Sequence, residues 1–181
     1  MKKKYTLIEN EKYKLIIILD KNDFDYYTDI CLDLIFAEKD IVLFNDNLLA
    51  LKNIVEQNNE TVHILDGNLN EKSLGLLLNE YYRCLYENQM QDVIVLDNQG
   101  RWIGEKYNCF SNLEYATWIY KYAGNIIMKV TPIFSGFEED DYIQAYKQFI
   151  KDYEDVFKET ISLQQLKTVK KIILELYDEL F

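Results

Sequence analysis

The chain has 181 residues, 49% of them hydrophobic and 28% charged, and this length and composition predict one globular domain with its own core and argue against disorder. The chain has 31 Asp and Glu residues against 20 Lys and Arg, which gives a net charge of −11. This charge argues against nucleic acid or an anionic membrane as a direct ligand, because both need a positive protein surface. The charge favours instead a basic protein or a cation as the partner.

The N-terminus and the cysteines indicate a cytoplasmic protein. Lysines 2–4 could open a signal peptide, but Glu9 brings a charge before an apolar region can form, and no cleavage site of small residues follows. The longest apolar run, residues 15–19, is too short to span a bilayer. The cysteines match no metal or redox spacing, which favours free thiols in a reducing compartment: Cys31, Cys84 and Cys109.

The N-terminal part of the chain is rich in strand-like patterns. Alternating or β-branched runs predict strands over residues 4–8, 12–19, 24–36, 41–44 and 61–65, and helical spacing predicts a helix over 46–57 that Asn45 caps. The first two strands flank Glu9-Asn10-Glu11, a plausible hairpin connection.

The strand predicted over residues 24–36 has the longest alternation in the chain. One face collects apolar side chains, and the other carries a row of aspartates, namely Asp23, Asp25, Asp29 and Asp33. Such period-two patterning predicts an antiparallel strand with one face in water. The row would serve a basic partner, or it would protect the sheet against aggregation.

The C-terminal part combines further strands with helices. We predict a helix that Asn70 caps and that runs to about residue 85. Strands are predicted next, over residues 92–96, 101–106, 115–122 and 126–134. A turn at 97–100 separates the first two strands, and a loop at 108–112 precedes the third. Pro132 predicts that the last of these strands ends there or lies at an edge. Two C-terminal helices come last, and Ser162 with Gln165 forms the capping box of the second.

These elements predict an α+β fold: a mainly antiparallel twisted sheet with helices packed on it, two of them C-terminal. The chain contains one Pro, six Gly and no low-complexity linker or internal repeat. We therefore expect residues 1–181 to form a single domain.

The sequence contains no recognisable catalytic, cofactor or metal motif. His63 is the only histidine and lies in an apolar run, which favours a structural role, and no nucleophile elbow or glycine-rich phosphate loop is present. Asp20, Asp23 and Asp25 resemble the start of a calcium loop, but the required glycine and the distal glutamate are missing. We therefore predict a protein that is not an enzyme and that has no cofactor.

Aromatic residues and a second acidic segment suggest a contact surface. The chain has 15 Tyr against 9 Phe, which is typical of packing at the core boundary or of an interface. Glu138, Glu139, Asp140 and Asp141 directly precede a predicted helix. They would favour that helix through its dipole, or they would form a docking patch together with Phe134, Phe137 and Tyr142.

Residues 92–157 combine three motifs, the first two of them aromatic: Gly100-Arg-Trp-Ile-Gly-Glu-Lys-Tyr107, Tyr115-Ala-Thr-Trp-Ile-Tyr120 and Ile127-Met-Lys-Val-Thr-Pro132. This half of the chain resembles small cytosolic bacterial immunity proteins encoded beside polymorphic or contact-dependent toxins. The motifs are structural aromatics, so the resemblance transfers no active site. It implies a protein that binds and neutralises one cognate toxin domain, often a basic nuclease.

The leading hypothesis is therefore an immunity protein that occludes a toxin domain, with monomer as the favoured state. Its predicted partner-binding residues are Asp25, Asp29, Asp33, Phe137, Glu138, Glu139, Asp140 and Asp141. Acidic groups would speed association while aromatic groups would supply affinity. The alternatives are a metal-assisted hydrolase that uses clustered carboxylates and a structural or homo-oligomeric scaffold built on the C-terminal helices.

Overall fold

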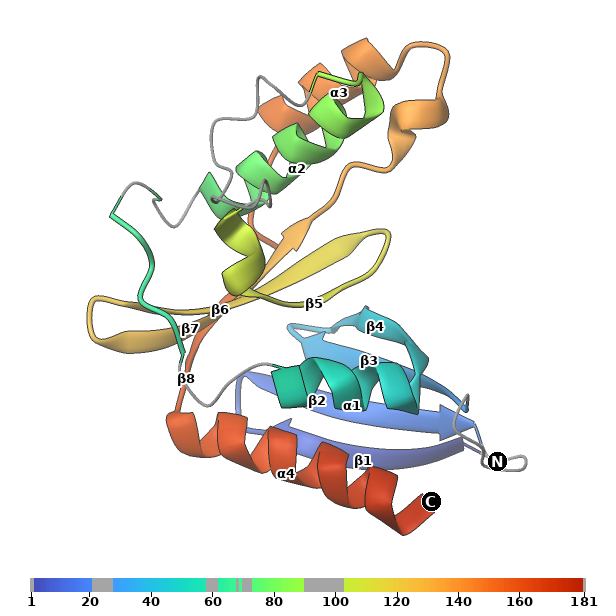
Figure 1. Ribbon diagram of the computed structural model, residues 1–181, viewed down its shortest axis with the longest axis vertical. Coiled ribbons are helices and arrows are strands. Elements are labelled where there is room, and N and C mark those ends of the chain that lie inside the picture. The colour runs from blue at the N-terminus through green and yellow to red at the C-terminus, as the bar shows by residue number, and fades with distance from the viewer. Residues whose placement is uncertain are drawn as a thin grey trace. The chain divides into compact units, whose positions relative to one another are not determined.

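The computed structural model describes residues 2–20, 28–57, 62–67, 69, 73–89 and 103–180 (Figure 1). The chain divides into two compact units: residues 1–61, 109–112 and 161–181 form the first, and residues 62–108 and 113–160 form the second. Two antiparallel four-stranded sheets and four α-helices make up the described part of the chain. The predicted α+β class is confirmed, with two sheets in place of one, and the single domain stays a prediction.

The first sheet has the order β1-β2-β3-β4, and each strand runs antiparallel to its neighbour. Its strands are β1 Lys2–Glu9, β2 Tyr13–Asp20, β3 Asp29–Phe36 and β4 Lys39–Asn47. The predicted first hairpin is confirmed, and the amide groups of Lys12 and Tyr13 close its turn by donating to Asn10 Oδ1 at 2.9 and 3.0 Å. The next hairpin turns at Ala37 and Glu38, which both have positive φ, as two-residue hairpin turns require.

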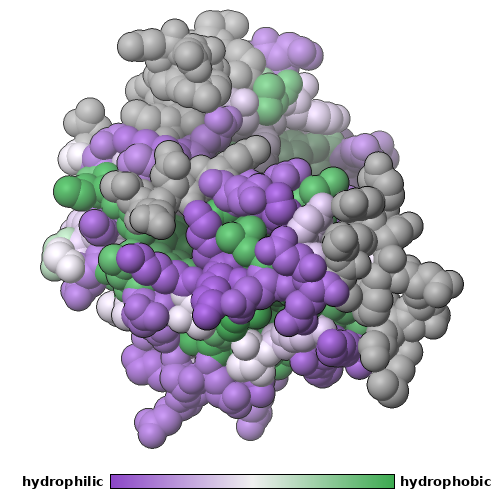
Figure 2. All heavy atoms as spheres, turned by 60° about the horizontal axis from the view of Figure 1, so that its bottom comes forward, coloured by the Kyte–Doolittle hydropathy of each residue, from purple (hydrophilic) through white to green (hydrophobic). Residues whose placement is uncertain are grey.

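Helices α1 Leu48–Gln57 and α4 Leu163–Leu180 pack against each other and contact β4 and β1, respectively. The core of this unit lies between these helices and the sheet. Successive side chains of a strand point to opposite faces, and the face toward the helices carries a set of buried apolar residues, namely Leu15, Ile17, Ile30, Leu32 and Leu34. On α4 the buried stripe is Val169, Ile173 and Leu176. In Figure 2, which turns the lower edge of Figure 1 toward the viewer, hydrophilic side chains predominate and hydrophobic ones lie in separate small areas.

Both helices of the first unit begin at side-chain caps. The predicted capping box is confirmed, since Gln165 N donates to Ser162 Oγ at 3.1 Å and Ser162 N donates to Gln165 Oε1 at 2.8 Å. The prediction for α1 is wrong by two residues: Ala50 N donates to Asn47 Oδ1 at 2.8 Å, whereas Asn45 lies within β4. The strand extends further than its apolar residues indicate, so the cap comes later.

The second sheet has the order β5-β6-β7-β8, with β5 Asn108–Ser111, β6 Tyr115–Tyr122, β7 Asn125–Pro132 and β8 Phe157–Ile161. The hairpin of β6 and β7 matches its prediction, and Pro132 ends β7 as expected. Helices α2 Ser73–Tyr86 and α3 Tyr142–Lys151, with the short 3₁₀ helices η2 Ile103–Lys106 and η3 Gly136–Glu138, complete the described elements.

Several local predictions in this half are wrong. Residues 103–106 are helical and residues 108–111 form a strand, the reverse of the expected strand and loop. Residues 62–65 make only a bridge between Ile64 and Lys121, and His63 is exposed, not part of an apolar strand. Strand β8 lies between the two predicted C-terminal helices, in a segment for which no strand was expected. The predicted strand at 92–96, the turn at 97–100 and the cap Asn70 lie outside the described residues.

Helix α2 is fixed to the second sheet by buried polar contacts. Asn79 is fully buried, and its Nδ2 donates to the carbonyl oxygens of Gly75 and Pro132 at 2.8 and 3.0 Å while its Oδ1 accepts from Phe134 N at 2.6 Å. Within the sheet, buried Trp118 donates to Thr131 Oγ1 at 2.8 Å. These bonds satisfy groups that are costly to leave unpaired away from water.

The segment after α3 is joined to β7 by an ion pair. Lys129 is fully buried, and its Nζ lies 2.8 Å from Asp155 Oδ1. A buried ammonium requires such a partner. The pair thus holds the segment that leads into β8 beside β7, where Val156 N also donates to Val130 O at 2.9 Å.

Candidate functional site

The strongest candidate surface lies where α2 and α3 meet in the second unit. A polar clamp joins the two helices there, with Arg83 of α2 between Glu80 of the same helix and Glu87, which directly follows the helix. The guanidinium contacts Glu80 Oε1 at 2.6 Å and also pairs with Glu87. Tyr146 of α3 donates to Glu80 at 3.2 Å, and Tyr142, one turn earlier, donates to Glu87 at 3.1 Å. The same carboxylates thus hold Arg83 and dock α3.

The electrostatics of the clamp follow from these contacts. The hydrogen bonds that Arg83 donates to the two glutamates raise its pKa, led by those to Glu80. Arg83 in turn lowers the pKa of Glu80. Burial, followed by the charge of Glu80, raises the pKa of Tyr146. Arg83 is therefore a cation that the chain itself already neutralises.

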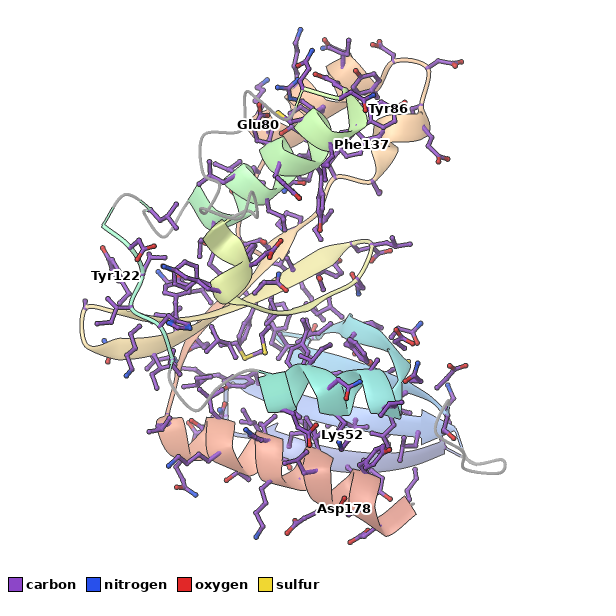
Figure 3. The ribbon with its side chains drawn as sticks, viewed as in Figure 1. Lys52, Glu80, Tyr86, Tyr122, Phe137 and Asp178 are labelled. Carbon is purple, nitrogen blue, oxygen red and sulfur yellow. The ribbon has the colours of Figure 1, made fainter. Side chains whose placement is uncertain are left out.

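Beside the clamp lies an aromatic platform formed by Tyr86, Phe137 and Tyr142. The rings of Tyr86 and Phe137 stack with centroids 5.2 Å apart and planes at 27°, and Tyr142 meets Tyr86 edge-on at 5.2 Å. Figure 3 shows Tyr86 and Phe137 side by side. Tyr86 is 48% exposed, whereas Phe137 is half-buried and contacts buried Phe134 beneath it at 4.9 Å. The platform is thus the outer end of an aromatic core.

The acidic segment, residues 138–141, follows Phe137 directly in the chain. All four side chains are exposed, and they form no hydrogen bond or ion pair with the described residues. Asp141 stands at the N-cap position of α3, yet its side chain makes no capping hydrogen bond. Capping therefore does not account for these four charges.

The structure treats the two predicted groups of partner-binding residues differently. Phe137 and residues 138–141 gather with Tyr86 in the second unit, whereas Asp29 and Asp33 lie on β3 of the first unit and Asp25 lies outside the described residues. Sequence reasoning missed Tyr86 because it follows Leu85 at the end of the apolar stripe of α2. Leu85 is 43% exposed, and buried Cys84 takes the inner position.

The expected exposure of Asp33 is wrong. Its neighbours across the sheet are Ile16 and Val42, on the face opposite Leu32 and Leu34. The side chain is only 6% exposed, and its Oδ1 has no hydrogen-bond partner among the described residues. Burial raises the pKa of Asp33, Asp40 raises it further, and Lys4 with Lys2 opposes both. Asp29, by contrast, is exposed, so no exposed aspartate ladder joins these two residues.

We expect Asp33→Asn to raise the free energy of unfolding by about 1 kcal/mol at pH 7, because it removes a buried charge with an unsatisfied oxygen. Since the pKa of Asp33 is raised in the folded state, the ionised form disfavours folding above that raised pKa. This penalty disappears as the pH falls to the ordinary Asp value of about 4. Urea unfolding at both pH values measures the gain, which should be present at pH 7 and absent at pH 4.

The exposed Asp29 of the same strand provides the control, and Asp29→Asn should change stability little at either pH. Two outcomes contradict the interpretation of Asp33: a loss of stability at pH 7, or an equal gain at both pH values.

Within the described residues, no three His, Cys, Asp or Glu side chains come together as a metal site would require. None of the helices described is long and apolar enough to cross a membrane. No protein-family model, no curated protein and no solved structure matches the chain.

Proposed function

We propose that this protein is a cytoplasmic immunity protein that binds and neutralises a basic toxin domain, and that the aromatic platform with the acidic segment is its contact surface. The observation that carries the proposal is the position of four exposed carboxylates, which have no partner among the described residues, directly after Phe137, whose ring stacks on exposed Tyr86. Such like charges repel one another, and a basic partner would relieve that repulsion.

The carboxylates and the aromatic residues of this surface would have different roles in binding. Exposed carboxylates steer a basic partner and orient it, chiefly by speeding association. Aromatic anchors supply most of the affinity at interfaces, since large apolar surface is removed from water there. The clamp of Glu80, Arg83 and Glu87 holds α2 against α3, so the platform is formed before the partner arrives and little ordering is needed on binding.

The test is binding and neutralisation of the protein encoded by the adjacent gene, measured at rising salt concentrations. In the test variant, Glu138→Gln, Glu139→Gln, Asp140→Asn and Asp141→Asn are combined. We expect this variant to bind at least about tenfold more weakly and to show a smaller salt dependence.

A control variant with the same change of charge combines Glu11→Gln, Glu38→Gln, Asp178→Asn and Glu179→Gln, all exposed positions of the first unit. It should bind within about threefold of the unaltered protein. Binding that is indifferent to salt and equal in the two variants would rule out this surface, and absence of binding and of neutralisation would rule out the proposed function.

A further inference from the structure

The geometry of the aromatic platform restricts the side chain that it can accept. Its ring centroids lie 5.2 to 6.2 Å apart, so the rings touch one another and leave no room between them for a cation. The platform is therefore a packed group of rings and not an aromatic cage around a central ligand. A ligand has to lie on the exposed outer part, of which Tyr86 contributes the largest share.

The platform has no cation of its own among the described residues. Arg83, the nearest basic residue along α2, is held by Glu80 and Glu87. Cation–π contacts in the described chain occur elsewhere, for example between Lys52 and the ring of Tyr177 at 5.0 Å. The rings of Tyr86 and Phe137 are thus left for a cation that comes from another molecule.

A guanidinium fits this surface better than an ammonium does. It is planar, stacks on an aromatic face and is more weakly hydrated, and its edge N–H groups can bond to carboxylates at the same time. Residues 138–141 supply such carboxylates directly after Phe137. An ammonium gains the charge attraction but not the stacking.

We infer that the platform binds an arginine side chain of the protein partner, with the guanidinium stacked on Tyr86 and paired with the acidic segment. This inference rests on the proposed function for the identity of the partner, but its chemistry can be measured without that partner. The probes are hexa-arginine and hexa-lysine peptides, which carry the same number of charged side chains.

We expect hexa-arginine to bind about fivefold more tightly than hexa-lysine, as judged by calorimetry at physiological salt. Tyr86→Leu should reduce the affinity for hexa-arginine to that for hexa-lysine and leave hexa-lysine binding unchanged, whereas Tyr86→Phe should keep the preference. Tyr122 offers a matched control because it is 46% exposed, near the 48% of Tyr86, and lies at the end of β6 (Figure 3). Tyr122→Leu should change neither affinity.

Equal affinities for the two peptides, a preference that survives in Tyr86→Leu, or no binding of either peptide would overturn the inference. If both peptides bind equally and lose affinity when residues 138–141 are neutralised, arginine recognition fails while the proposed acidic contact surface stands. If the arginine preference depends on Tyr86 but the adjacent gene product is neither bound nor neutralised, the proposed function fails and the arginine site remains.

Discussion

Replacing Asn79 with leucine is expected to lower the free energy of unfolding by about 3 kcal/mol. Leucine has a similar size, so the change creates little cavity, but it removes the donor to Pro132 O and the acceptor for Phe134 N. A buried group left without its hydrogen bond costs about 1–3 kcal/mol. The Phe134 amide carries most of the loss, because its bond to Asn79 is buried.

Urea unfolding followed by far-UV circular dichroism measures the loss. The control is Asn53→Leu, because Asn53 also lies on a helix but is exposed, and a surface substitution of this kind usually changes stability by at most about 0.5 kcal/mol. If Asn79→Leu were as stable as Asn53→Leu, the two bonds of Asn79 to Pro132 and Phe134 would not be what holds α2 to the end of β7.

Features set by a few neighbouring residues were predictable from the sequence. The capping box of Ser162 and Gln165 is an example, since both of its hydrogen bonds lie within three residues. The hairpin of β6 and β7 is another, because its alternating residues and its turn are contiguous. In both cases the chain neighbours that decide the structure are visible in the printed sequence.

Features that depend on distant residues were not predictable. The segment 157–161 has apolar side chains only at its two ends, and pairing with the sheet makes it β8. The turn at Ala37 and Glu38 contains no glycine, although both residues have positive φ, so the pairing of β3 with β4 must impose a conformation that single residues avoid. Tertiary contacts outweigh local propensity in such segments.

The candidate site shows the same division. The acidic segment and Phe137 could be proposed from the sequence because they are consecutive. Tyr86 is 51 positions before Phe137 in the numbering, and only the docking of α3 on α2 brings their rings to 5.2 Å. The prediction for Asp33 was wrong for a different reason, since alternation placed it on the face opposite Leu32 and Leu34 but could not show that its side chain is buried there.

Gly75→Ala is the second substitution with a large expected effect, a loss of about 2 kcal/mol of unfolding free energy. A Cβ at this position would lie 1.7 Å from Tyr153 Oη and 2.7 Å from both Thr131 Cβ and Thr131 Oγ1. Residue 75 lies in the first turn of α2, where the backbone passes directly over β7. Overpacking of this kind typically costs about 1–3 kcal/mol.

The sign of the change makes Gly75→Ala decisive. Helix propensity alone favours Ala over Gly by about 1 kcal/mol in a helix interior, so a helix that did not touch the sheet would gain stability. Gly67→Ala is the control because, among the described residues beyond its chain neighbours, no atom lies within 4 Å of its added Cβ, and it should be close to neutral in urea unfolding. Tyr153→Phe removes the atom nearest to the new methyl group, so adding it to Gly75→Ala should restore part of the loss, while the contact with Thr131 remains. A gain of stability in Gly75→Ala would show that α2 stands further from the sheet than the contacts of Asn79 and Gly75 indicate.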